Sequence, residues 1–484
     1  MLLLYILCAV IAFGLYWWYK KPDKFPPGPK GLPLLGVLPY LSAFPEREFS
    51  AWSKKYGPIL SVSMGWQDWI VLSDYDVIIE TLVKHSDEFH ERPYVRFFCM
   101  LTSNGVVFTP GGQKWRSHRR FGVGAIRSFG GSKGVMEKKI NEEALHFTQQ
   151  LQELEGKPFQ IQDILTNAVS NVFCNIAFGR RYDYDDAKFQ SLIESLVALF
   201  KIAGNWKTNA MMFVPFLCDI PPFSWHVQKS MESIQPIRDM ITDLYEEHKS
   251  TYDPKDIRDI MDGYLQSFQC DENEFMLKDI QDFFIDMFVA GTDTAASTLR
   301  WGLLCIMLHV GVQERMQEEI DNIIGRYGTP SLSDREKMPY CCAVVHEVFR
   351  FKTLAALSLP RCVHKDVTVR GYFIPKGTRV MTNLWHVHND DTYWTKPELF
   401  APERHLNENG KFTNSRHVMP FGAGARVCMG EQLARAESWL FLITIIQRFR
   451  ISVDPDDPDP PSLSRGSNGL VYIPDAYNMI IHSR

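Results

Sequence analysis

The sequence predicts a large, mainly α-helical protein with a small β portion. Apolar residues that recur three and four positions apart indicate long helices at 163–178, 189–200, 230–248, 277–311 and 430–448. Short segments of alternating character indicate strands at 59–64 and 69–72, and the chain returns to strand at 472–474 and 479–481. Beyond residue 36 the sequence has no further linker, low-complexity tract or internal repeat. We therefore expect residues 37–484 to form one catalytic domain.

The N-terminal segment has the composition of a membrane anchor. Residues 1–19 include no charged side chain, and at ~1.5 Å per residue a helix of this length nearly spans a ~30 Å hydrocarbon layer. Positive charges follow the segment, at Lys20, Lys21, Lys24 and Lys30. This asymmetry predicts a single retained anchor with the rest of the chain facing the cytosol. A cleaved signal peptide is the alternative, but its basic n-region and small-residue cleavage site are missing.

Two further segments bear on the membrane. Residues 20–36 are basic and rich in proline, and prolines at this density block both helix and central strand, so we expect a stiff, extended hinge. The apolar run 211–216 lies between two helical patterns. It is a candidate for a second contact with the membrane interface.

The composition excludes some classes of function. Apolar residues make up 45% of the chain, and the formal net charge is −5, so we expect a large core and no nucleic-acid partner. The ten cysteines show neither the paired spacing of a zinc site nor that of a small disulfide scaffold. They are typical of reduced thiols that face the cytosol.

One cysteine lies in a glycine-rich loop that suits a thiolate bound to haem iron. Residues 421–430 read Phe-Gly-Ala-Gly-Ala-Arg-Val-Cys-Met-Gly, and a helical pattern follows. A thiolate ligand needs backbone N–H donors and a nearby cation, and the glycines let the main chain approach the sulfur of Cys428 closely. A tight turn before an ordinary buried cysteine is an alternative. A nucleotide-binding loop is another, although its preceding strand and following acidic residue are missing.

The same ten residues resemble the haem-binding signature of the cytochrome P450 family, Phe-x-x-Gly-x-Arg-x-Cys-x-Gly, at every fixed position. The resemblance implies the cytochrome P450 fold and a haem cofactor whose axial ligand to iron is Cys428. It also implies that Arg426 binds a haem propionate and that Phe421 packs near the sulfur. Segments 170–184 and 371–378 are similar to the microsomal branch of the family, which includes drug-metabolising, fatty-acid and steroid hydroxylases of the endoplasmic reticulum membrane.

A polar segment interrupts the long helix predicted at 277–311. Glycine costs about 1 kcal/mol in a helix interior relative to alanine, and residues 290–294 read Ala-Gly-Thr-Asp-Thr. A threonine hydroxyl can bond to a carbonyl one turn earlier and open the helix above a haem, although a kinked core helix is the alternative. The segment is similar to the family's oxygen-activation motif. That similarity implies that Thr294 donates a hydrogen bond to dioxygen, that Asp293 supplies protons, and that Ala290 faces the distal pocket.

Further arginines match family motifs. Glu347 and Arg350 are three residues apart, so they share a helix face and can pair, although such pairs are common by chance. The resemblance implies that they form a buried structural triad with Arg404. It also implies that Trp115, Arg119 and Arg361 bind the haem propionates together with Arg426. His405 replaces the phenylalanine that usually follows Pro-Glu-Arg in this family.

An electron donor must come from outside, because the chain has no flavin or nicotinamide fingerprint of its own. The resemblance implies an NADPH-dependent flavoprotein reductase, with a small haem electron-transfer protein as a second donor. Residues 92–136 contain no acidic side chain. Their basic residues suggest a docking surface for an acidic donor. These are Arg92, Arg96, Lys114, Arg116, Arg119, Arg120, Arg127 and Lys133. A solvated basic face is the alternative.

The substrate pocket is expected to be apolar and the substrate a lipophilic small molecule: a xenobiotic, a fatty acid or a steroid. Candidate wall residues are Phe97, Phe98, Val107, Phe284, Met287, Ala290, Leu357 and Leu470. The leading function is a haem-thiolate monooxygenase. An isomerase or dehydratase on the same fold is one alternative, and the presence of Asp293 and Thr294 argues against it. A haem sensor without turnover is another, in which an open distal helix and an electron-donor surface would have no purpose.

Overall fold

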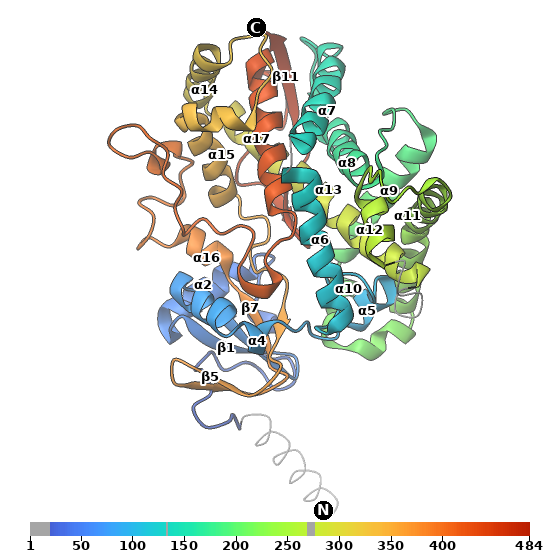
Figure 1. The fold of residues 1–484 in the computed structure, drawn as a ribbon. Helices are drawn as coiled ribbons and strands as arrows, with labels where there is room; N and C mark the ends of the chain where they lie inside the picture. The colour runs from blue at the N-terminus through green and yellow to red at the C-terminus, as the bar shows by residue number, and fades with distance from the viewer. Residues whose placement is uncertain (1–19, 132–133, 269–275) are drawn as a thin grey trace, which may run out of the picture.

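The computed structural model describes residues 20–131, 134–268 and 276–484. It confirms the mainly α-helical fold with a small β portion (Figure 1). The long helices are α6 (Gln113–Gly131), α7 (Val135–Gln152), α8 (Gln162–Phe178), α9 (Ala187–Ala203), α11 (Phe223–Thr251), α13 (Leu277–Leu308), α14 (Val310–Ile323), α15 (Pro339–Phe351) and α17 (Glu431–Arg448). Shorter helices are α2 (Pro45–Tyr56), α3 (Tyr75–Ile79), α4 (Ser86–Phe89), α5 (Arg96–Leu101), α10 (Trp206–Phe213), α12 (Ile260–Phe268) and α16 (Leu384–Asn389).

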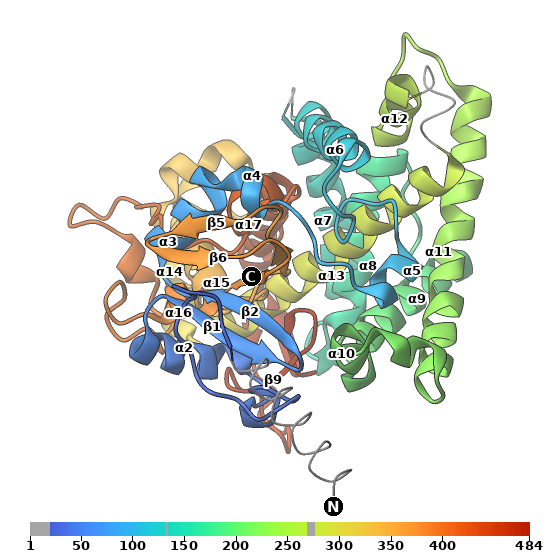
Figure 2. The same cartoon turned by 90° about the horizontal axis from the view of Figure 1, so that it is seen from below.

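The strands form small separate sheets. The largest has the order β1 (Ile59–Met64), β2 (Gln67–Leu72), β7 (Arg379–Thr382) and β4 (Arg361–Cys362), with β2 and β7 parallel. The others pair β3 (Phe159–Gln160) and β8 (Phe449–Ser452) with β11 (Asn478–Ser483), β5 (Val367–Val369) with β6 (Tyr372–Ile374), and β9 (Gly466–Asn468) with β10 (Tyr472–Pro474). Figure 2 shows β1, β2, β5 and β6 on one side of the molecule and α6, α9 and α11 on the other, with α13 between them.

Helix α13 ends earlier than its apolar pattern predicts. The sequence predicts one helix through residue 311, but the helix stops at Leu308, and α14 leaves at an angle of 104°. The ring of His309 bonds the carbonyl of Cys305 at 2.7 Å, so a side chain satisfies a terminal carbonyl that the next turn would otherwise bond. The other predicted helices and strands are present, with ends that shift by a few residues.

The hinge predicted at 20–36 is an extended connector without helix. It lies along β1, where the Ser61 backbone N–H donates to the carbonyl of Pro27 at 2.8 Å and the Ser61 hydroxyl donates to that of Pro26 at 2.7 Å. The predicted anchor, 1–19, lies outside the described residues. Among the helices that are described, none is by itself long and apolar enough to cross a bilayer, and only α13 and α14 taken together reach that length and composition. The domain boundaries at 19 and 36 stay predictions.

A buried ion network lies at the end of α15. The carboxylate of Glu347, which is 0% exposed, accepts two hydrogen bonds from Arg350 at 2.7 and 2.8 Å and one from Arg404 at 3.0 Å. His405 donates a fourth, from Nε2 at 2.8 Å. Burial lowers the pKa of His405, so its neutral ring is a fixed donor to the carboxylate. The predicted triad is therefore a group of four residues, and the unusual His405 belongs to it.

The network supports the loop that carries Cys428. Arg350 donates to the carbonyl of His388 at 2.7 Å, and Nε2 of the His388 ring accepts the backbone N–H of Met419 at 2.9 Å. Burial lowers the pKa of His388 to about 3, so Nε2 stays unprotonated and remains an acceptor. Because Met419 lies directly before the cysteine loop, buried hydrogen bonds connect Glu347 to the position of that loop.

We expect Glu347→Gln to destabilise the protein by about 3–5 kcal/mol, because it leaves Arg350 buried without its counter-charge. Burial alone raises the pKa of Glu347, but the hydrogen bonds from Arg350 and His405 lower it from 4.5 to about 2. The ionised carboxylate therefore stabilises the fold above pH 4.5, and this contribution is lost as the pH falls towards 2. Urea unfolding at a series of pH values measures both effects.

The matched control is Glu408→Gln, which changes an exposed side chain and should stay within about 0.5 kcal/mol of the parent protein. The Glu347→Gln protein should lack the component of the pH dependence that lies between pH 4.5 and 2. An unchanged pH dependence in that variant would show that Glu347 does not hold the fold together in this way.

Candidate functional site

A cavity of about 410 Å³ lies between α13 and the cysteine loop. Its wall is mostly apolar and combines side chains from α5, α9 and α13 with those of the loop at 354–359 and the turn at 470–471. Cys428 and Thr294 both line it. Segments far apart in the sequence therefore meet around one apolar space.

The cysteine loop holds its sulfur toward this cavity. Gly422 and Gly424 have φ angles of 73° and 74°, which favour glycine, and a Cβ on Gly424 would lie 1.9 Å from the carbonyl oxygen of Leu82. The Cys428 N–H donates to the carbonyl of Phe421 at 3.0 Å and closes the loop. Cys428 is exposed because it faces the cavity.

Opposing effects act on the thiol of Cys428. Burial, with a smaller contribution from the Glu431 carboxylate, raises its pKa above that of an ordinary cysteine, whereas the backbone N–H groups of Gly430 and Glu431 and the guanidinium of Arg119 act to lower it. These donors and this cation are what a thiolate ligand requires. A metal bound to the sulfur would complete the stabilisation of the charged form.

Arginines gather beside the cysteine on the same wall. Arg92, Arg119, Arg361 and Arg426 all line the cavity. Burial and mutual repulsion lower the pKa of Arg361 to about 10 and that of Arg426 to about 9. Backbone carbonyls hold the group in place: Arg361 donates to Ala423 at 2.6 Å, and Arg426 donates to His90 and Thr109 at 2.8 Å.

This arginine cluster fits the two carboxylates of a haem. Within the described part of the chain, none of its four guanidinium groups has a carboxylate within 4.0 Å. The Trp115 ring stacks on Arg426, with 3.7 Å between the guanidinium carbon and the ring centroid. Its buried Nε1 has no hydrogen-bond partner in the part of the chain that the structure describes. Buried guanidinium groups and buried N–H donors require a negatively charged or hydrogen-bonding partner. The two propionates of a haem would meet this requirement.

The polar segment of α13 faces the cavity in part. Ala290, Gly291 and Thr294 line it, and the Thr294 hydroxyl donates to the carbonyl of Ala290 at 2.7 Å, as the sequence suggests. Helix α13 nevertheless continues through this point without a break. Asp293 is not part of the cavity wall. Burial raises the pKa of Asp293 to about 6, and no described residue forms a hydrogen bond with its Oδ2.

Most residues predicted for the substrate pocket do line the cavity. These are Phe97, Phe98, Val107, Met287, Ala290 and Leu470. Phe98 and Phe108 stack with their ring centroids 3.9 Å apart, which makes a flat aromatic wall. The prediction of an apolar pocket agrees with this lining.

Two of the predicted pocket residues lie elsewhere. Phe284 is 0% exposed, and its ring packs against Phe178 and Tyr264, because it occupies the part of α13 that joins the helical core. Leu357 packs against the core formed by β1 and β2. The next residue, Ser358, has a left-handed φ of 53°, and this turn places Ser358 rather than Leu357 at the cavity.

The basic residues of 92–136 do not form one surface, contrary to the prediction. Arg92 and Arg119 belong to the arginine cluster, Arg96 pairs with Asp219 at 2.5 Å, and Lys114 pairs with Asp279 at 3.0 Å. Lys133 lies outside the described residues. The exposed members are Arg116, Arg120 and Arg127, all on α6. Helical geometry and ion pairing, which composition does not reveal, divide the group.

Sequence reasoning missed several residues of the cavity. Arg92 counted only as part of the basic run, yet it donates to the carbonyls of Leu359 and Pro360 at 2.8 and 2.7 Å. Glu437 and Lys352 also line the cavity. Burial raises the pKa of Glu437 well above its ordinary value and lowers that of Lys352 to about 8. Only the acid-free stretch around Arg92 could have drawn attention to it.

Comparison with known proteins agrees with this geometry. The family model for cytochrome P450 matches residues 26–481. Cytochrome P450 2H2 of Gallus gallus is 36% identical, over 95% of this chain and 93% of the relative. Cytochrome P450 2F2 of Mus musculus is 37% identical over 95% and 94%, and cytochrome P450 2C20 of Macaca fascicularis is 34% identical over 98% of each chain. The chain therefore belongs to the cytochrome P450 family.

Membership of the cytochrome P450 family establishes the class of reaction and the cofactor. The protein is a haem monooxygenase that acts on lipophilic substrates, and its cofactor is haem with an axial cysteine thiolate. Like other members it depends on a redox partner. Its relatives belong to the microsomal branch, which associates with the endoplasmic reticulum membrane.

We expect Arg119→Gln to release haem faster than the parent protein. Removing a charge-assisted hydrogen bond costs about 1.5–3 kcal/mol, or roughly ten- to a hundredfold in the rate of release. Transfer of haem to an apoglobin acceptor, followed by absorbance, measures this rate. Arg116→Gln, on the exposed side of the same helix, is the control and should behave like the parent. If both variants release haem at the same rate, Arg119 does not bind the haem.

Proposed function

We propose that this protein inserts one oxygen atom into a xenobiotic, a fatty acid or a steroid, with electrons from NADPH through a flavoprotein reductase. The observation that carries the proposal is the shared cavity of Cys428, Thr294 and four arginines without carboxylate partners. Haem bound through a thiolate supplies the activation of dioxygen. Cys428 would hold the iron, with Phe421 beside the sulfur. Trp115 and the arginine cluster would hold the propionates.

Thr294 and Asp293 would control protons on the distal side. The Thr294 hydroxyl lines the cavity and bonds the Ala290 carbonyl, so it can hold a water or dioxygen in a defined position. Asp293 lies next to it, and with a pKa of about 6 it can exchange protons near neutral pH. In this proposal Asp293 supplies protons and Thr294 delivers them.

The electron donor would dock on the exposed face of α6. Arg116, Arg120 and Arg127 are exposed there, and Arg119 of the same helix donates to the carbonyl of Val427, next to Cys428. A cationic face so close to the sulfur would attract an acidic flavoprotein reductase or a small acidic haem protein. Because such steering is screened by salt, reduction by the donor should slow as ionic strength rises.

The membrane arrangement is also part of the proposal. Residues 1–19 would anchor the protein in the endoplasmic reticulum membrane, and the charges that follow would keep the catalytic domain in the cytosol. The hinge that lies along β1 would then fix the orientation of the domain against the membrane. The cavity wall, which is mostly apolar, suits substrates that partition into that membrane. Reconstitution with reductase and NADPH, with product analysis, tests the whole reaction.

We expect Cys428→Ser to abolish thiolate ligation, because a hydroxyl is a poor ligand for ferric iron. The reduced carbon monoxide complex should lose its red-shifted Soret band. Cys362→Ser, which changes a cysteine outside the haem cavity, should keep the band and is the control. The assignment of Cys428 would be wrong if the two variants gave the opposite results.

We expect Thr294→Ala to separate NADPH consumption from product formation. One hydroxyl contributes only about 1 kcal/mol to stability, so folding, haem content and substrate binding should remain close to those of the parent. NADPH oxidation should continue while product per NADPH falls and hydrogen peroxide accumulates. Simultaneous assays of NADPH, peroxide and product check this. Thr292→Ala, on the same helix but away from the cavity, should keep the parent ratio, and unchanged coupling in Thr294→Ala would contradict the role.

A further inference from the structure

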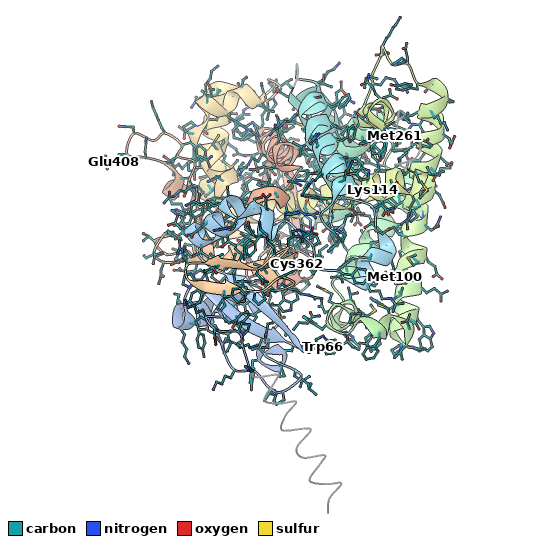
Figure 3. The ribbon with its side chains drawn as sticks, turned by 60° about the horizontal axis from the view of Figure 1, so that its bottom comes forward. Trp66, Met100, Lys114, Met261, Cys362 and Glu408 are labelled. Atoms are coloured by element: carbon teal, nitrogen blue, oxygen red, sulfur yellow. The ribbon has the colours of Figure 1, made fainter. Side chains whose placement is uncertain are left out.

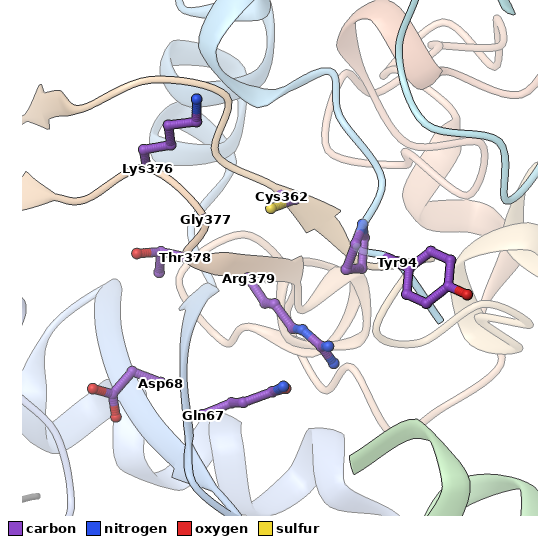
Figure 4. A pocket seen from close by; sticks show the side chains of 9 residues that line it. Gln67, Asp68, Tyr94, Cys362, Lys376, Gly377, Thr378 and Arg379 are labelled. Atoms are coloured by element: carbon purple, nitrogen blue, oxygen red, sulfur yellow. The ribbon is translucent and has the colours of Figure 1, made fainter. Parts of the chain in front are cut away.

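A second pocket, of about 420 Å³, lies beside the β1–β2 hairpin (Figure 4). Its wall is formed by Gln67, Asp68, Pro93, Tyr94, Cys362, Lys376, Gly377, Thr378 and Arg379. Arg361 and Cys362 are consecutive on β4, so their side chains point to opposite faces: Arg361 lines the haem cavity and Cys362 lines this pocket. The pocket therefore lies behind the wall that carries the arginine cluster and is separate from the haem cavity.

Arg379 is the central cation of this pocket. The residue is 9% exposed, and its guanidinium carbon lies 5.2 Å from the centroid of the Trp69 ring. In the described structure its guanidinium makes one hydrogen bond, a long one from Nη1 to the carbonyl of Met212 at 3.5 Å. No described carboxylate lies within 4.0 Å of the guanidinium. Most of its N–H donors are therefore available on the pocket side.

Gln67 offers a second polar group at the same place. Its Oε1 is buried and has no hydrogen-bond partner among the described residues. Figure 4 shows the side chains of Gln67 and Arg379 converging, so that their polar ends lie near one another. Because an amide can turn about its terminal bond, Gln67 can offer either its oxygen or its NH₂ to a bound group. The two side chains form a cradle that can offer a guanidinium and an amide to one bound group.

The charge around this cradle is positive. Asp68 accepts hydrogen bonds from Lys21 and Ser63, and Figure 4 shows its carboxylate directed away from Arg379. Lys376 also belongs to the wall, but Figure 4 shows its ammonium directed away from Arg379, so Arg379 is the cation that faces Gln67. A guanidinium binds oxyanions through paired N–H donors, so the pocket suits a phosphate or carboxylate group rather than a cation.

The position of the pocket points to the source of the anion. Lys21, which bonds Asp68 in the pocket wall, lies directly after the predicted anchor. Large side chains nearby are exposed: Trp66 by 51%, Tyr94 by 62% and Phe216 by 58%. Trp66 lies in the lower part of the view in Figure 3. Phe213 belongs to the predicted interfacial run, 211–216, and its ring centroid lies 6.1 Å from that of Trp69. Met211 of the same run is buried.

We propose that this pocket binds the phosphate of an anionic membrane phospholipid, with Arg379 paired to phosphate oxygens and Gln67 holding another polar atom of the headgroup. The proposal rests on the proposed membrane association for the source of the ligand. Exposed aromatic side chains at the rim would contact the acyl region. The choline of a zwitterionic lipid would bring a cation toward Arg379 and Lys376, so the pocket should favour anionic lipids over phosphatidylcholine.

The test uses the full-length, haem-loaded protein in nanodiscs of phosphatidylcholine with a minor fraction of phosphatidylinositol. After extraction into detergent, mass spectrometry counts the lipids that remain bound to the protein. We expect phosphatidylinositol to be enriched over its share in the disc by roughly tenfold. Arg379→Gln should abolish this enrichment, and Arg379→Lys, which keeps the charge but loses the paired donors, should reduce it.

The control is Arg326→Gln, at an exposed arginine that follows α14 at the other end of the molecule (Figure 1). It should retain lipid like the parent. All variants should keep the red-shifted Soret band of the carbon monoxide complex, which separates loss of the lipid site from loss of the haem fold. Gln67→Met tests the cradle without changing its charge and should also lower the enrichment.

A soluble arm distinguishes the source of the phosphate. Glycerophosphoinositol and inorganic phosphate are offered to the protein in equilibrium dialysis. Weak binding of both, lost in Arg379→Gln, together with strong retention of the intact lipid, supports the lipid headgroup. If the soluble phosphates bind but the lipid is not enriched, the ligand of this pocket is a free phosphate compound and not a membrane lipid. Equal lipid enrichment in the parent protein and in Arg379→Gln would overturn the site.

Discussion

The buried carboxylate of Glu347 is the interaction on which the rest of the site depends. A single ionised group accepts bonds from Arg350, Arg404 and His405, and so joins α15 to the segment before the cysteine loop. Removing water from charges is costly unless every one is paired, and this requirement fixes the distance and orientation of the partners. Through His388 and Met419 the same constraint reaches the loop of Cys428.

The charges of the haem cavity, unlike those of the Glu347 network, are not paired within the described structure. Its wall carries more positive charge than the carboxylates around it neutralise. Burial and the repulsion of neighbouring arginines, Arg119 and Arg361 among them, lower the pKa values of Arg92 and Arg426, so the wall carries an electrostatic penalty that two propionates would relieve. Folding and cofactor binding are coupled through that penalty, because a ligand that binds only the folded state stabilises it. The arginine cluster would thus retain the haem while backbone carbonyls keep the guanidinium groups in position.

Helix α13 connects the structural and chemical roles of the molecule. Its core residues pack against α8 and α17, while Ala290 and Thr294 face the cavity. The Thr294 hydroxyl bonds the Ala290 carbonyl without interrupting the helix, and Thr294 still lines the cavity. Proton handling can therefore occur next to a rigid wall, which is the arrangement expected where a reaction must exclude stray water.

The sequence by itself determined the mainly helical fold, the cysteine loop and the face of α13 that carries Thr294, because periodicity and glycine placement are local properties of the chain. It did not determine which neighbours those faces meet. Only the tertiary structure brought Arg92 into the arginine cluster and His405 into the Glu347 network, and only the structure removed Phe284 and Leu357 from the pocket. These outcomes depend on contacts between residues tens to hundreds of positions apart, such as Arg92 with Leu359. The sequence pattern specifies the side chain but not the packing that decides its partner.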